Sequence, residues 1–126
     1  MHIEHIALAV KDLENMREFY ETFFNAKSNE KYHNPKTQFQ SYFLTFESGC
    51  RLELTNKKFF AESAYEQLGY AHIAISVGDK RTVDLYADKF VQAGLPLLSG
   101  PRTTGDGYYE AVVQDPEGNL IELTTD

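Results

Sequence analysis

The chain is poor in cysteine, in long apolar runs and in positive charge. Cys50 is the only cysteine, so no disulfide can form within the chain. The chain has twelve Lys and Arg residues and nineteen Asp and Glu residues, which gives a net charge of −7. This negative charge argues against nucleic acid or an anionic membrane as the main partner. No apolar run approaches the length of a membrane span, and the start lacks the features of a signal peptide. These absences predict a soluble cytoplasmic protein.

The chain has an internal repeat. The segment from His5 to Asp12 (HIALAVKD) returns from His72 to Asp79 (HIAISVGD), 67 positions later. A second pair of strings, LELT at 52–55 and IELT at 121–124, closes each half. With 126 residues, the chain suits a single domain made of two modules, which we place at about 1–56 and 70–126.

Each module has the pattern of a β-α-β-β-β unit, so the predicted class is α+β. Alternating apolar residues predict strands at 3–10, 39–46, 50–55, 71–77, 95–98, 108–114 and 120–124. A further short strand is expected around 28–32. Apolar residues at helical spacing follow Asp12 and Asp79, which are good N-cap residues. The residues of the second helix that we expect to face the sheet are Val83, Leu85, Tyr86, Phe90 and Val91. Gly94 is expected to end this helix. The glycine-rich residues 100–107 are expected to form a loop.

The segment from Asn56 to Tyr70 interrupts the repeat and connects the modules. It holds two lysines and several aromatic residues. These aromatics either pack across the module junction or form a lid over a substrate. The sequence leaves both interpretations open.

Each module opens with a strand that carries a His and ends with a strand that carries a Glu. These residues are His5 and Glu53 in the first module, and His72 and Glu122 in the second. Taken singly, each His could be a satisfied core residue and each Glu could face solvent. Solvent-facing positions, however, have no reason to match in both copies. Imidazole nitrogen and carboxylate oxygen are typical ligands of a divalent transition metal, so we predict one four-ligand metal site.

The repeated motifs also resemble a known family. The opening HIALAVKDL at 5–13, GYAHIA at 69–74 and DPEGNLIEL at 115–123 are similar to those of the vicinal oxygen chelate superfamily. The superfamily includes glyoxalase I, extradiol dioxygenases and fosfomycin- and bleomycin-resistance proteins. The resemblance covers essentially the whole chain. It implies paired βαβββ modules whose strands form a curved, mostly antiparallel eight-stranded sheet around a metal.

Within that superfamily, the ligand set His5, Glu53, His72 and Glu122 resembles bacterial glyoxalase I. The resemblance implies a lyase or isomerase with one Ni, Co or Zn ion per site, acting on the hemithioacetal of methylglyoxal and glutathione. It also implies that Glu122 is the base and that Glu53 is its pseudo-symmetric partner. In such enzymes the halves of one site come from different subunits, which implies a homodimer.

The sequence departs from glyoxalase I where that enzyme binds glutathione. Ala9 occupies the position of an Arg that holds the glutathione carboxylate, and Asn56 stands one place before the position of a glutathione-contacting Asn. We therefore expect a small substrate with vicinal oxygens, bound with the help of Lys57, Arg102 or Tyr108. The alternatives are another metal-dependent isomerase or epimerase, or a non-catalytic protein that sequesters a drug or metabolite.

Overall fold

The computed structural model describes residues 4–57, 70–105 and 107–126. The chain divides into two compact units, Met1–Ser63 and Ala64–Asp126. The elements of the first unit are β1 (His5–Ala9), α1 (Leu13–Phe24), β2 (Lys27–Ser28), β3 (Tyr32–Asn34), β4 (Phe39–Thr45) and β5 (Arg51–Asn56). Those of the second unit are β6 (Ile73–Gly78), α2 (Lys80–Gln92), β7 (Leu97–Thr103), β8 (Tyr109–Gln114) and β9 (Leu120–Thr125). No helix in these described ranges is long and apolar enough to cross a membrane.

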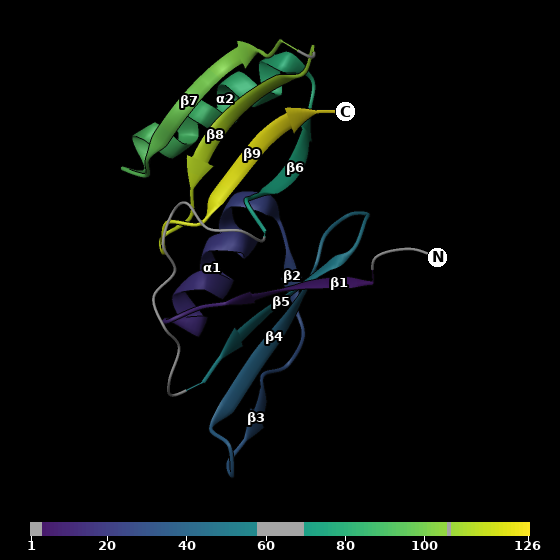
Figure 1. Cartoon of the computed structure of the whole chain (residues 1–126), viewed down its shortest axis with the longest axis vertical. Helices are drawn as coiled ribbons and strands as arrows, with labels where there is room; N and C mark the ends of the chain where they lie inside the picture. The colour runs from purple at the N-terminus through teal and green to yellow at the C-terminus, as the bar shows by residue number, and fades with distance from the viewer. Residues whose placement is uncertain (1–3, 58–69, 106) are drawn as a thin grey trace. The chain divides into compact units, whose positions relative to one another are not determined.

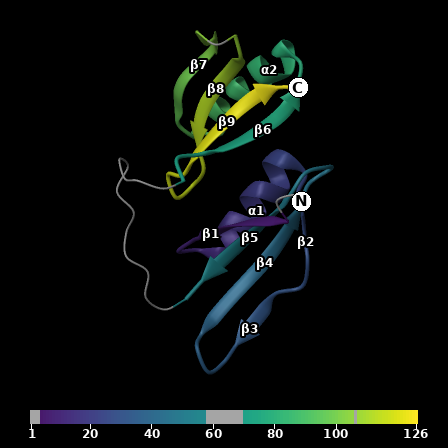
Figure 2. The ribbon, with the colours of Figure 1, turned by 45° about the vertical axis from the view of Figure 1, so that its right-hand side comes forward.

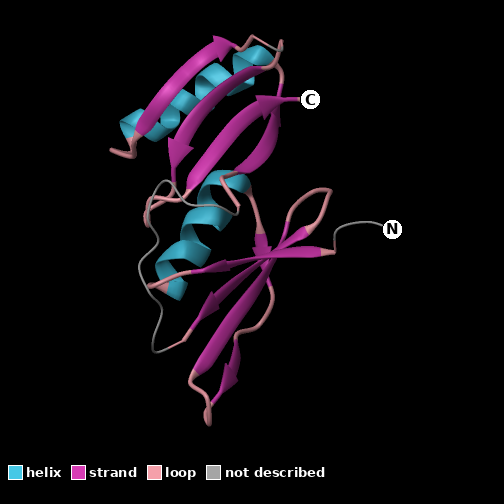
Figure 3. Cartoon of the chain, viewed as in Figure 1, coloured by secondary structure: helices cyan, strands magenta, loops and turns pink. Residues whose placement is uncertain are grey.

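The described part of each unit forms one sheet with one helix on one of its faces (Figures 1 and 3). The strand order is β1-β5-β4-β2 in the first sheet, with β3 also pairing with β4, and β6-β9-β8-β7 in the second. The pairs β1/β5 and β6/β9 are parallel and the other pairs are antiparallel, and Figure 2 shows both parallel pairs from a second direction. The α+β class is confirmed, and its strands divide between a five-stranded and a four-stranded sheet.

Both helices begin at the predicted cap residues. Asp12 accepts a hydrogen bond from the backbone N–H of Asn15 at 3.0 Å, and Asp79 accepts one from that of Thr82 at 2.8 Å. These bonds satisfy N–H groups that a first helical turn leaves without a partner. Gly94 follows the last residues of α2 with φ +73°, as predicted for the residue that ends this helix.

The face of α2 that packs on the sheet is narrower than predicted. Val83, Ala87 and Phe90 are buried, whereas Leu85 is 57% exposed and Val91 is 55% exposed. Each residue advances a helix by about 100°, so Leu85 lies roughly 200° round the helix from Val83. The prediction that Leu85 and Val91 face the sheet is therefore wrong.

Strand β7 is longer than predicted. It continues through Gly100, Pro101 and Arg102 to Thr103, so the predicted loop at 100–107 is wrong for its first four residues. The register with β8 shifts between Leu97 and Ser99 and again between Ser99 and Arg102, and such irregularities are where an edge strand tolerates Gly and Pro. Gly100 has φ +81°, and a Cβ there would lie 2.5 Å from the carbonyl oxygen of Glu110. Glycine is therefore required by both conformation and space.

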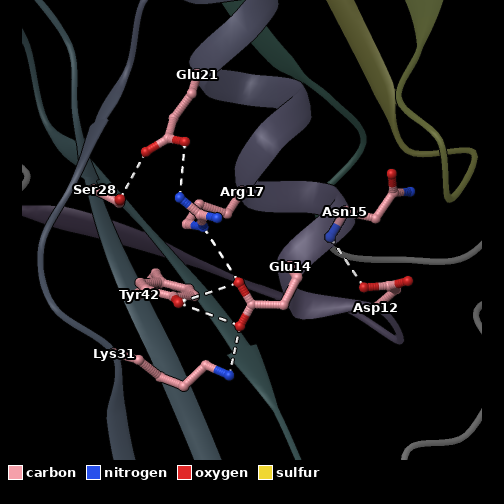
Figure 4. Close-up of polar contacts among 8 residues, drawn as sticks. All are labelled: Asp12, Glu14, Asn15, Arg17, Glu21, Ser28, Lys31 and Tyr42. Carbon is pink, nitrogen blue, oxygen red and sulfur yellow. Dashed lines mark hydrogen bonds and ion pairs between the residues drawn. The ribbon is translucent and has the colours of Figure 1, made fainter.

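The first unit ties its helix to its sheet by charged side chains (Figure 4). The Glu14 carboxylate on α1 lies 2.5 Å from Lys31 Nζ and accepts a hydrogen bond from the Tyr42 hydroxyl at 3.2 Å. The hydrogen bond with Lys31 lowers the pKa of Glu14 and, in turn, raises the pKa of Lys31. Further along α1, Glu21 accepts hydrogen bonds from Arg17 and Ser28.

The helix leaves one face of each sheet uncovered within its unit, and we call this the helix-free face. In β5, Leu52 and Leu54 are buried on the helix side. In β9, Ile121 and Leu123 are likewise buried on the helix side. Because side chains alternate along a strand, Glu53 and Glu122 lie on the helix-free faces.

Candidate metal centre

His5 and Glu53 come together on the helix-free face of the first unit. Parallel pairing sets Ala7 opposite Glu53, so His5, two residues earlier on β1, is a diagonal neighbour of Glu53. The distance from His5 Nε2 to Glu53 Oε2 is 3.9 Å. The Glu53 side chain is only 16% exposed, which shields its carboxylate from water more than that of a typical surface Glu.

The second nitrogen of His5 contacts Glu4, which is not among the predicted site residues. His5 Nδ1 lies 2.5 Å from Glu4 Oε2, and the Arg51 Nε–H donates to the other oxygen of Glu4 at 2.7 Å. Both hydrogen bonds lower the pKa of Glu4, and the one with His5 has the larger effect. Arg51 also lies over the Phe43 ring at 4.2 Å, and Phe43 meets the His5 ring edge-on at 5.3 Å.

Glu4 has no acidic counterpart in the second module, where Ala71 occupies the equivalent position. The internal repeat therefore gives no indication of a role for Glu4. The available signal was an acidic residue directly before a candidate ligand His, which is a common outer partner of metal-binding imidazole.

His72 and Glu122 come together in the second unit. Their Nε2 and Oε2 atoms are 3.2 Å apart, and the Glu122 side chain is 23% exposed. The register sets Ala74 opposite Glu122, which repeats the diagonal arrangement of the first unit. Strand β6 begins at Ile73 rather than at the predicted Ala71, so His72 lies immediately before the strand.

Each unit thus presents one imidazole nitrogen and one carboxylate oxygen on the same face. These donors suit a divalent first-row transition metal, and His5, Glu53, His72 and Glu122 are the residues that could hold one. Over residues 4–57, 70–105 and 107–126, no group of three or more His, Cys, Asp or Glu side chains forms a metal cluster. The two pairs belong to different units.

The predicted substrate-binding residues lie at exposed positions. Lys57 is exposed directly after β5. Arg102 on β7 is 58% exposed, with Nη2 3.9 Å from Glu110 Oε1, and Tyr108 before β8 is 60% exposed. The predicted lid or junction segment falls mainly on residues 58–69, which lie outside the described residues.

The structure places the two residues at which the sequence departs from the glyoxalase I pattern, Ala9 and Asn56. Ala9 is exposed at the end of β1 and alternates onto the same face as His5. Asn56 donates through Nδ2 to the carbonyl oxygens of Val10 and Lys11 at 2.7 and 2.9 Å. Its amide hydrogens are therefore engaged in joining β5 to the chain after β1.

Several known proteins are similar to this chain in sequence and fold. The chain is 32% identical to the lactoylglutathione lyase of Haemophilus influenzae over 98% of its own length and 91% of the relative. It is 29% identical to the metallothiol transferase FosB of Lysinibacillus sphaericus over 98% of its length and 81% of the relative. The trypanothione-dependent glyoxalase I of Leishmania major superposes with a TM-score of 0.79 at 27% identity, over 99% of this chain and 86% of that one. The model of the Glyoxalase/Bleomycin resistance protein/Dioxygenase superfamily matches residues 2–123, and the chain belongs to that superfamily.

Proposed function

We propose that this protein is a divalent-metal-dependent lyase or isomerase of the glyoxalase I type, acting on a small substrate with vicinal oxygens. The observation that carries the proposal is the repeated pair: His5 with Glu53 and His72 with Glu122, each on a helix-free face. Membership of the superfamily and the similarity to lactoylglutathione lyase support the same reaction class.

The four side chains have distinct roles in this proposal. His5, Glu53, His72 and Glu122 hold one Ni, Co or Zn ion, which when bound supplies a Lewis acid that polarises substrate oxygens. Glu122 takes a proton from one carbon of the substrate and returns it to the adjacent carbon, so the net change is an isomerisation. Glu53 occupies the matching position of the other module.

We also propose that the protein acts as a homodimer in which the first module of one chain completes its site with the second module of another. In such a dimer, a His5→Ala chain and a His72→Ala chain together rebuild one intact site. Random mixing of the two inactive variants should then restore about one site in four. No recovery of activity on mixing would contradict shared sites and favour a site completed within one chain.

We further propose that the preferred substrate is not an adduct of glutathione. A glutathione carboxylate facing Ala9 lacks the charged partner that glyoxalase I supplies there, so we expect weak use of glutathione adducts. Lys57, Arg102 and Tyr108 are the candidate contacts for a different substrate. The similarity to a metallothiol transferase adds thiol transfer as a reaction to be assayed alongside isomerisation.

The test is an assay of protein loaded with Ni²⁺, Co²⁺ or Zn²⁺ against a panel of α-oxo thiol adducts, α-hydroxy ketones and epimerisable acids. Metal-free protein and the Glu122→Gln variant serve as controls. Metal-dependent isomerisation that is lost in Glu122→Gln supports the proposal. Epimerisation alone or thiol transfer alone would replace it with another enzyme of the superfamily, and tight ligand binding without turnover would replace it with a sequestering protein.

A further inference from the structure

The Glu4 carboxylate connects two side chains of the first unit, one through each oxygen. Oε2 lies 2.5 Å from His5 Nδ1, and Oε1 accepts hydrogen bonds from Arg51, including one from Nε at 2.7 Å. The backbones support the same contact, because the Arg51 N–H donates to the Glu4 carbonyl at 3.0 Å. Residues at the start of β1 and of β5 are thereby joined around one carboxylate.

This arrangement selects one form of the His5 ring. A neutral imidazole carries its hydrogen on one nitrogen only, and a carboxylate can only accept. The contact with Glu4 therefore places the hydrogen on Nδ1 and leaves the lone pair on Nε2. Nε2 is also the atom that faces Glu53, at 3.9 Å.

We propose that Glu4 is a positioning residue that fixes the tautomer and orientation of His5, with Arg51 holding Glu4 in place. The role in metal binding rests on the proposed function, whereas the tautomer does not. Phe43 limits the ring further, because it contacts His5 edge-on at 5.3 Å and lies beneath the Arg51 guanidinium at 4.2 Å.

The second unit shows that this support is specific to the first. Repeat positions place Ala71, Leu120 and Val112 where the first unit has Glu4, Arg51 and Phe43. Side chains of this kind cannot form the same carboxylate–guanidinium support. His72 therefore provides an internal reference within the same protein.

The first test measures the tautomer in metal-free protein. Two-bond ¹⁵N–¹H correlation spectra of the histidine rings, recorded where the rings are neutral, distinguish Nδ1–H from Nε2–H. We expect Nδ1–H for His5 in the wild type and in Glu4→Gln, which keeps an acceptor oxygen. In Glu4→Ala the signal should move toward Nε2–H, the form that free imidazole prefers. His72 should not change.

Two controls separate positioning from loss of charge. Glu18→Ala removes an exposed carboxylate of α1 and should leave His5 unchanged. Arg51→Met should loosen Glu4 and give a spectrum between those of the wild type and Glu4→Ala. A His5 that keeps Nδ1–H in Glu4→Ala would overturn the proposal, because Glu4 would then be only a surface ion-pair partner.

The second test measures metal affinity in the same variants by competition with a chelator. Loss of an outer carboxylate partner should weaken Ni²⁺ or Zn²⁺ binding about 10- to 100-fold in Glu4→Ala, with Glu18→Ala unchanged. A wild type that binds metal while Glu4→Ala binds equally well would overturn only the role of Glu4 in metal binding. A wild type that binds no metal would overturn the proposed function, and the tautomer result would still decide whether Glu4 orients His5.

Discussion

The two halves of the candidate metal centre use the same residue types but hold them differently. In the first unit, the imidazole is held from behind by Glu4, and its Nε2 stands 3.9 Å from the Glu53 carboxylate. In the second unit, His72 Nε2 lies closer to its Glu partner, 3.2 Å from Glu122 Oε2. The repeat therefore preserves the candidate ligands without preserving the side chains around them.

This difference suggests a division of labour under the proposed function. A ring held by an outer carboxylate would offer a constant ligand, whereas Glu122 lies beside a His whose repeat position has Ala71 in place of such a carboxylate. On the basis of this asymmetry we propose that Glu53 mainly holds the metal and that Glu122 is the base. Each prediction below compares a position in one unit with its counterpart in the other.

The largest expected effect separates Glu122 from Glu53. Glu122→Gln should reduce kcat by about 10²- to 10⁴-fold, because the proton-transferring group is lost. Glu53→Gln should instead weaken metal binding by roughly tenfold or more, with a smaller loss of kcat at saturating metal. Steady-state kinetics and metal analysis of both variants check this, and equal losses of kcat would mean that the two modules share the chemistry.

The second prediction concerns the turns that lead into the Glu-bearing strands. Asp115 is 2% exposed, and its carboxylate accepts from the backbone N–H groups of Glu117 and Asn119 and from the Asn119 amide. Asp115→Ala should lower the free energy of unfolding by about 2–4 kcal/mol, since three bonds to a buried acceptor are lost. The repeat places Phe46 at the corresponding position of the first unit.

Urea unfolding measures this effect. Asn119→Ala is the matched control, because it removes only one of the three bonds and should cost less. Asp115→Asn keeps an oxygen that can accept from the backbone, so it should also cost less than Asp115→Ala. A cost for Asp115→Ala below that of Asn119→Ala would contradict the role given to this carboxylate.

The third prediction uses Ala9 and its counterpart Ser76. Ala9→Arg should improve kcat/KM for the methylglyoxal–glutathione adduct by about 10- to 100-fold, the gain expected from one charge-assisted hydrogen-bonded partner worth roughly 1.5–3 kcal/mol. Ser76→Arg, in the second unit, and Ala9→Gln, without the charge, should give little improvement. A wild-type kcat/KM already above about 10⁶ M⁻¹s⁻¹ would show that Ala9 is no obstacle.

The smallest expected effect concerns how each helix is tied to its sheet. In the first unit, Glu14 contacts Lys31 and Tyr42, whereas in the second the Tyr109 hydroxyl donates to Asp84 at 2.6 Å. The pKa of Glu14 is lower in the folded state than in the unfolded state. The Glu14 carboxylate therefore adds to the free energy of unfolding above its unfolded pKa, and this stabilisation is lost as the pH falls through the folded pKa. Lys31 has a raised pKa, so its contribution is lost at strongly alkaline pH.

We therefore expect Glu14→Gln to remove part of the acid sensitivity of stability. The Glu14 side chain is 50% exposed, and solvent screening limits the effect at pH 7 to no more than about 1 kcal/mol. Unfolding at pH 7 and pH 3.5 measures it, with Glu18→Gln as the control. An identical pH dependence in Glu14→Gln and the wild type would show that the Glu14–Lys31 pair adds nothing to stability.

Local chemistry explains why much of the fold could be predicted from the sequence. Asp12, Asp79 and Gly94 act within one helical turn of their own position, so their roles are visible in neighbouring residues. The candidate ligands could be found because the same letters recur in both halves. Their pairing into His–Glu couples within each unit follows from the parallel pairing of β1 with β5 and of β6 with β9.

The features that were not predicted depend on strand register or on residues whose usual preference differs from the structure they adopt here. Glu4 meets Arg51 only because β1 and β5 pair in parallel with His5 opposite Arg51, and this register is not written in either segment alone. Gly100 and Pro101 are typical loop residues, yet a shifted edge strand accommodates them. Leu85 and Val91 are apolar, but they do not lie on the side of α2 that packs on the sheet. That side is occupied by Val83, Ala87 and Phe90.

The parallel pairing of β1 with β5 and of β6 with β9 also governs when the ligand pairs can exist. Each pairing joins the first strand of a unit to its last, with the helix and the remaining strands between them. Such long-range closure is slow compared with helix formation, and domains tend to fold as units from the N-terminus during synthesis. We therefore expect His5 to meet Glu53 when the first unit closes and His72 to meet Glu122 later, so that a growing chain brings its candidate ligands together in two successive steps.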